Sequence, residues 1–138
     1  MAEIEGKLAL IINTASYERV AFALGVAAAA AAIGRDVCVL FGYGGVVRLK
    51  KGNTDKVGTE TEVWLRERIR LAIARGGQAP ISELLDTLKK LGGRIYACPA
   101  AMELHNIVVG ELVEEVDEVR SVVRFVTEDI KDASVIYV

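Results

Sequence analysis

The chain has 138 residues, of which 52% are hydrophobic and only 6% aromatic, and its formal net charge at pH 7 is −2. This length fits one α/β domain spanning residues 1–138 around an aliphatic core, and the near-neutral charge gives no reason to expect a nucleic-acid partner. Two cysteines are too few for a disulfide framework, the N-terminus is acidic, and the longest apolar run is shorter than the roughly 20 residues of a membrane span, so we expect a cytoplasmic protein without a span.

Apolar runs predict the first two strands and the helix between them. Lys7–Ile12 and Asp36–Phe41 are continuous β-prone stretches, which is typical of strands buried on both faces. Ser16 suits the N-cap of a helix over 17–33, and Gly34 suits the residue that ends it. Because this helix is apolar nearly all round, it must be covered on more than one side, and we expect another subunit to supply part of that cover.

The segment after the second strand is more polar. Gly42–Gly45 has neither the P-loop pattern nor the full G-x-G-x-x-G spacing, so it is interpreted as a flexible corner. We predict an exposed loop over Arg48–Lys56 and a helix over Glu62–Arg75. Residues 48–75 carry eight basic and four acidic side chains, whereas 103–132 carry nine acidic and three basic ones. A solvated basic helix is the favoured interpretation, and an acidic partner or a complementary neighbouring subunit is the alternative.

The second half of the chain also alternates between helical and extended patterns. Pro80 opens a helix over Ile81–Leu91 that carries a stripe of leucine and isoleucine. A short amphipathic piece with a brief strand near Val116 follows further along, and then a helical face over 119–130. The last residues, Ala133–Val138, give a strong strand pattern.

Strands that alternate with helices need long crossovers, so the sheet is predicted to be parallel with helices on both faces. The carboxyl ends of parallel strands meet at one edge, where such sheets bind ligands. Three turns share that edge: Asn13–Ser16, Gly42–Gly45 and Cys98–Pro99. We therefore predict a crevice around Cys98. The residues expected to line or support it are Asn13, Thr14, Ser16, Gly42, Tyr43, Gly44, Pro99, Met102 and His105.

Cys98 is the candidate reactive residue of this crevice. It ends the β-prone run Arg94–Ala97, and Pro99 follows in a position that suits the first residue of a helix. Unpaired N–H groups and the dipole at a helix N-terminus favour a thiolate. The alternative is a small apolar residue tucked under a loop. For Cys38, which lies inside a strand, a place in the core is the favoured interpretation.

His105 lies about two helical turns after Cys98, roughly 10 Å along the axis, which is too far for a general base within one subunit. We interpret it as a helix-terminal or interface residue, and Asn106 as a left-handed turn residue. One histidine and two separated cysteines do not make a zinc site, and we expect no cofactor. A thiolate without a base still attacks sulfur, so sulfur transfer or redox chemistry is favoured over hydrolysis.

Three features of the sequence belong together: the corner with Cys98, Met102 and Ile107, the helix, Gly-Gly and strand that precede it, and the first and last strands. With these features the chain resembles the DsrE/DsrF/DsrH-like family of small sulfur-relay proteins over about Lys7–Val138. The resemblance implies a three-layer α/β/α fold with a mainly parallel sheet of about five strands, assembled as a homo-oligomer (a trimer or hexamer). It also implies that Cys98 carries a persulfide between sulfur donor and acceptor proteins, as in a sulfurtransferase. Some relatives lack the cysteine and serve as structural subunits, so such a subunit is one alternative. The glycine-rich turn and the charge asymmetry favour another, a non-catalytic module that binds a small ligand or a protein in the same crevice.

Overall fold

The sheet of this computed structural model, which describes residues 6–138, has five strands in the order β4-β3-β2-β1-β5. The strands are β1 (Lys7–Ile12), β2 (Asp36–Phe41), β3 (Arg94–Ala97), β4 (Glu118–Val119) and β5 (Ala133–Tyr137). Every pairing between them is parallel. The predicted parallel α/β sheet is therefore confirmed.

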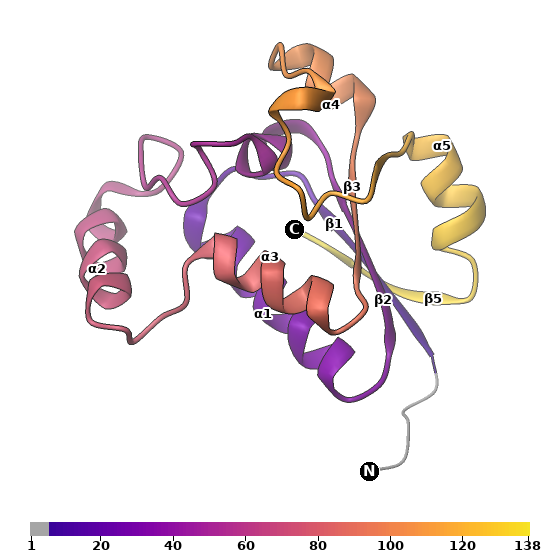
Figure 1. The fold of residues 1–138 in the computed structure, drawn as a ribbon, viewed down its shortest axis with the longest axis horizontal. Coiled ribbons are helices and arrows are strands. Elements are labelled where there is room, and N and C mark those ends of the chain that lie inside the picture. The colour runs from indigo at the N-terminus through magenta and orange to yellow at the C-terminus, as the bar shows by residue number, and fades with distance from the viewer. Residues whose placement is uncertain (1–5) are drawn as a thin grey trace.

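Helices cover both faces of this sheet, which confirms the three-layer arrangement (Figure 1). The α-helices are α1 (Tyr17–Ala32), α2 (Val63–Ala74), α3 (Ile81–Lys90), α4 (Pro99–Leu104) and α5 (Val122–Arg124). Two 3-10 turns, η1 (Tyr43–Leu49) and η2 (Val109–Glu111), and a π-helical turn, η3 (Phe125–Asp129), complete the chain. In Figure 1, α1 and α3 lie on one side of the sheet, α5 with η3 on the other, and α4 at the strand ends. None of the helices within residues 6–138 has the length and apolarity needed to cross a membrane.

The strand register places one row of side chains under α5 and η3. Ile11 of β1 pairs with Leu40 of β2, and Leu40 pairs with Tyr96 of β3, so the three side chains point to the same face. The Tyr96 ring meets Phe125 of η3 edge-on, with 6.4 Å between the ring centroids. Phe125 is thus held against the sheet near its carboxyl end, beside the predicted crevice.

Two predictions for the segment after β2 are wrong. Gly42–Gly45 is not a flexible corner, because the chain winds into η1, and an added Cβ at Gly45 would lie 2.3 Å from the Ile12 carbonyl oxygen. The predicted loop Arg48–Lys56 is not wholly exposed, because Arg48 is only 2% exposed and Thr54 is also buried. The Arg48 guanidinium donates hydrogen bonds to backbone carbonyls and a carboxylate, and these bonds offset the free-energy cost of burying its charge.

The end of the chain also differs from its prediction. The brief strand predicted near Val116 is present at Glu118–Val119, but Val119 belongs to this strand instead of beginning a helix. The helix starts only after Ser121, whose hydroxyl accepts a hydrogen bond from the Arg124 N–H at 3.1 Å. This N-cap fixes the start of α5 at Val122, so two residues separate it from the end of β4.

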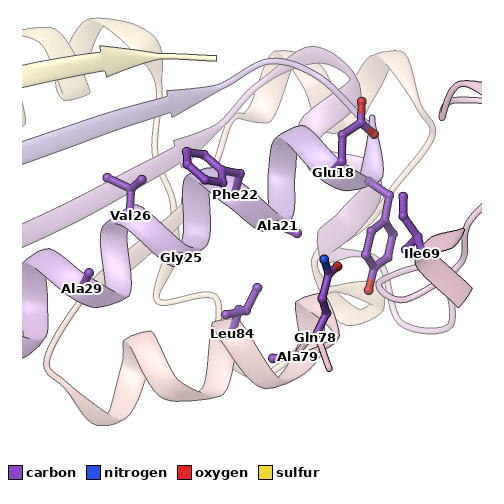
Figure 2. A pocket seen from close by; sticks show the side chains of 11 residues that line it. Glu18, Ala21, Phe22, Gly25, Val26, Ala29, Ile69, Gln78, Ala79 and Leu84 are labelled. Carbon is purple, nitrogen blue, oxygen red and sulfur yellow. The ribbon is translucent and has the colours of Figure 1, made fainter. Parts of the chain in front are cut away.

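The outer side of α1 is left uncovered by the other described residues. It forms a groove of about 550 Å³ with Ile69 of α2 and Leu84 of α3 (Figure 2). Glu18 and Phe22 stand along this groove, and Phe22 is 76% exposed. One carboxylate oxygen of Glu18 is buried there without a hydrogen-bond partner among the described residues. An exposed phenylalanine beside an apolar groove is typical of a helix surface that contacts another molecule.

Candidate functional site

A pocket of about 540 Å³ lies at the carboxyl end of the sheet, on the side covered by α5 and η3. Strand ends, the turns that follow them, α4 and α5 all contribute to its wall. The lining residues are Ile11, Asn13, Leu40, Gly42, Tyr43, Cys98, Ala100, Ala101, Leu104, Val122, Phe125, Val126 and Tyr137. The edge predicted to bind ligands therefore carries a cavity of the size that small-molecule sites have.

Cys98 occupies the N-cap of α4, with φ −75° and ψ 125°, and Pro99 is the first helical residue. Its N–H donates to the Phe41 carbonyl at 3.0 Å, which fixes the corner to the end of β2. The cysteine is 6% exposed and contributes to the pocket wall. Ala100 and Ala101 line the same wall, and N–H groups in the first turn of a helix have no acceptor within it. The structure thus places the thiol at the start of a short helix.

The opposite wall is organised by Asn13 at the end of β1. Its side-chain amide donates to the Tyr137 hydroxyl at 2.7 Å, which links the ends of the neighbouring strands β1 and β5. Gly42 makes room for this side chain, since an added Cβ there would lie 2.4 Å from Asn13 Oδ1. Tyr43 follows with φ 37°, an unusual value for a residue that carries a side chain. Such backbone strain tends to cluster at functional sites.

Four of the predicted site residues, Asn13, Gly42, Tyr43 and Cys98, come together in this pocket. The others do not line it: Thr14, Ser16, Gly44, Pro99, Met102 and His105. Thr14 accepts a hydrogen bond from the Ser16 N–H at 3.0 Å and shapes the turn after β1. Met102 is part of the hydrophobic core. His105 caps the end of α4, and its Nε2 is buried without a hydrogen-bond partner among the described residues.

Sequence reasoning missed the walls supplied from the end of the chain. The sequence places Val122 and Val126 on a helical face without indicating a role in the site, and in the structure both border the pocket. Tyr137 was seen only as part of a strand, although its place one residue before the end of the last apolar run puts it at the same sheet edge as the three turns. That position is the signal by which it could have been found.

The second cysteine, Cys38, lies in a different environment from Cys98. Cys38 lies on the same sheet face but earlier along β2, and it is 0% exposed. Burial, with the nearby Asp129 charge as a second cause, raises the pKa of Cys38 to about 11. A thiol in that setting stays protonated and out of reach at neutral pH. Cys38 is a core residue, as its sequence context indicates.

Comparisons with known proteins agree with this architecture. The model of the DsrE/DsrF-like family matches residues 6–133. Two solved structures are similar: the protein of unknown function MTH1491 from Methanobacterium thermoautotrophicum, with 17% identity and a TM-score of 0.70, and the ychN protein from E. coli, with 14% identity and a TM-score of 0.66. Each alignment covers 97% of this chain and 100% of the other. These identities show the fold alone. No curated protein matches the chain.

Proposed function

The chain belongs to the DsrE/DsrF-like family, and on that premise we propose that it is a sulfur carrier in which Cys98 accepts a sulfane sulfur and relays it to a partner thiol. The observation that carries the proposal is the position of Cys98 in the wall of the strand-end pocket. It is the only thiol among the lining residues, and the other described cysteine is sealed in the core. Relay of this kind needs a free thiol and therefore a reducing compartment such as the cytoplasm.

The proposed reaction is an exchange at sulfur. The Cys98 thiolate attacks a sulfane sulfur of the donor, a new S–S bond forms at Sγ, the bond between that sulfur and its neighbour in the donor breaks, and the donor leaves as a thiolate that takes up a proton from solvent. An acceptor thiolate then attacks the outer sulfur on Cys98 and restores the Cys98 thiolate. In both steps the sulfane sulfur moves from one thiol to another without a net oxidation or reduction, so no separate oxidant, metal or cofactor is required.

The surroundings support this role in two ways. Cys98 is the N-cap residue of α4, and the first N–H groups of a helix, with the positive end of its dipole, favour negative charge on an atom placed near them. Apolar side chains such as Phe125 and Leu40 form part of the pocket wall beside Cys98. The thiol therefore lies in a largely apolar pocket at the start of a helix.

Incubation with a sulfane-sulfur donor is expected to add the mass of sulfur to the wild-type chain at Cys98, seen by mass spectrometry without reductant. Cys98→Ser should take up none, because Cys38 is 0% exposed and its pKa is raised to about 11. Cys38→Ala is the matched control and should load like the wild type. Equal uptake by Cys98→Ser, or an unmodified wild type, would refute the carrier role.

We also propose that the protein is a homo-oligomer, a trimer or hexamer, in which the outer face of α1 lies at a subunit contact. Phe22→Glu places a charge beside the groove of Figure 2 and is expected to shift the mass measured by light scattering to that of the monomer. Val63→Glu is the control, since Val63 of α2 is comparably exposed but lies outside the groove. A monomeric wild type, or an unchanged mass for Phe22→Glu with native circular dichroism, would contradict this assignment.

A further inference from the structure

The Cys98 pocket has an uncharged lining. None of the thirteen lining residues is Lys, Arg, His, Asp or Glu. The side-chain polar groups are the Asn13 amide, the hydroxyls of Tyr43 and Tyr137, and the Cys98 thiol, and one amide hydrogen of Asn13 is already donated to Tyr137. Sites that bind small anions generally supply Arg or Lys side chains, or backbone N–H groups, as donors. This pocket has no cationic side chain to offer.

The one positive feature of the wall is the start of α4, and Cys98 itself occupies it. A thiolate at this position already balances the positive end of the helix dipole. An anionic donor would therefore meet a second negative charge in an apolar cavity whose wall carries no cationic side chain. In a low-dielectric setting the repulsion between like charges at contact distance is strong. An uncharged donor avoids this repulsion and replaces water against the apolar walls.

Access to Cys98 favours a small molecule. The cysteine is 6% exposed, so its sulfur is reached through the pocket and not from the open surface. The pocket of about 540 Å³ falls within the roughly 300–1,000 Å³ of small-molecule sites. Leu104, Val122 and Val126 line it and are themselves exposed large hydrophobic residues, so its entrance is apolar.

We infer, on the basis of the proposed function, that the sulfur donor of Cys98 is a small, uncharged, apolar sulfane-sulfur compound such as a dialkyl trisulfide, and not an anion such as thiosulfate. The thiolate attacks the central sulfur, an S–S bond forms at Sγ, the bond to one alkyl-bearing sulfur breaks, and an alkanethiolate leaves with a proton from solvent. A small thiolate then attacks the remaining alkyl-bearing sulfur, forms a disulfide with it and releases the Cys98 perthiolate. Thiol and trisulfide supply every atom and electron.

Three methanethiosulfonates that share one reactive group test the preference: the propyl, 2-hydroxyethyl and 2-sulfonatoethyl reagents. Their rates with Cys98 in the full chain are divided by their rates with free 2-mercaptoethanol. The normalised rate is expected to fall in that order, with at least a tenfold difference between propyl and sulfonatoethyl. Normalised rates within twofold of one another, or a faster sulfonatoethyl reagent, would overturn the inference.

A matched pair of variants places the effect in the pocket. Val126→Lys adds a cation to the wall and should raise the normalised rate of the sulfonatoethyl reagent at least threefold. Val123 is close to Val126 in the chain, is 73% exposed and does not line the pocket. The rates of Val123→Lys should therefore equal those of the wild type. Equal effects of the two variants would mean that general surface charge, and not the lining, controls access.

Loading with dimethyl trisulfide and with thiosulfate separates this inference from the proposed function. Sulfur on Cys98 from the trisulfide alone supports both. Sulfur from thiosulfate alone overturns the donor class and leaves the carrier role standing. If neither compound leaves sulfur on Cys98 while the propyl reagent is still preferred, the carrier role fails and the donor assignment falls with it, because only the apolar character of the pocket would remain.

Discussion

Replacing Arg48 with methionine is expected to lower the free energy of unfolding by about 3 kcal/mol, because it removes one partner of a buried, hydrogen-bonded charge network. The guanidinium donates from Nε to the Ala15 carbonyl at 2.9 Å and from Nη1 to the Asn53 carbonyl at 3.2 Å. It also donates to Lys56 and to the Glu60 carboxylate, and it lies 5.0 Å from the centroid of the Tyr17 ring. One side chain thus ties the turn after β1 to the loop after η1.

Methionine fills a similar volume but donates nothing, so the carbonyls that face Arg48 would be left unpaired in a buried setting. Arg48→Lys should lose most of the same free energy, because an ammonium cannot reproduce the fork of guanidinium donors. Urea unfolding followed by circular dichroism measures both changes. Arg68→Met on the exposed side of α2 is the control and should stay within about 0.5 kcal/mol of the wild type. A loss no larger for Arg48→Met than for Arg68→Met would show that the network contributes nothing.

Most of the sheet could be predicted because parallel strands buried on both faces leave a simple pattern. Lys7–Ile12, Asp36–Phe41 and Ala133–Tyr137 are apolar runs bounded by polar or glycine-containing turns, and each is a strand. The meeting of Asn13, Gly42 and Cys98 followed from topology, since the carboxyl ends of parallel strands share one edge. Chain order and strand direction were enough to bring these residues together.

Burial of charge could not be predicted in the same way. A polar stretch such as Arg48–Lys56 looks solvated, because the carbonyls that satisfy Arg48 come from two places along the chain, the turn after β1 and the loop after η1, and face it only after folding. The two-residue strand β4 carries too short a pattern to place from sequence. The contribution of Tyr137 to the pocket depends on β5 lying beside β1, which is set by the strand order and not by any local pattern.

A second buried ion pair anchors the wall of the Cys98 pocket that α5 and η3 form. Arg120 Nη1 lies 2.9 and 2.7 Å from the two carboxylate oxygens of Asp129, which is 2% exposed, and the guanidinium stacks 4.1 Å from the centroid of the Tyr96 ring. Burial alone would lower the pKa of Arg120, but hydrogen bonds to Asp129 and Glu118 raise it, so the guanidinium stays charged. Asp129 ends η3, the turn that presses Phe125 against the sheet.

Asp129→Asn is therefore expected to lower the free energy of unfolding by about 3 kcal/mol, because it leaves the buried Arg120 charge with only the partly exposed Glu118 and the more distant, exposed Glu128 as carboxylate partners. Urea unfolding measures the loss, and amide hydrogen exchange should quicken first within residues 122–129, where the wall of the pocket is anchored. Glu128→Gln is the matched control: Glu128 is the neighbouring acid, it is 54% exposed, and its removal should cost less than about 1 kcal/mol. If the two variants lose equal stability, the pair is no more than a surface contact. If instead Asp129→Asn loses stability without faster exchange in residues 122–129, the pair stabilises the protein as a whole and does not anchor the wall beside Cys98.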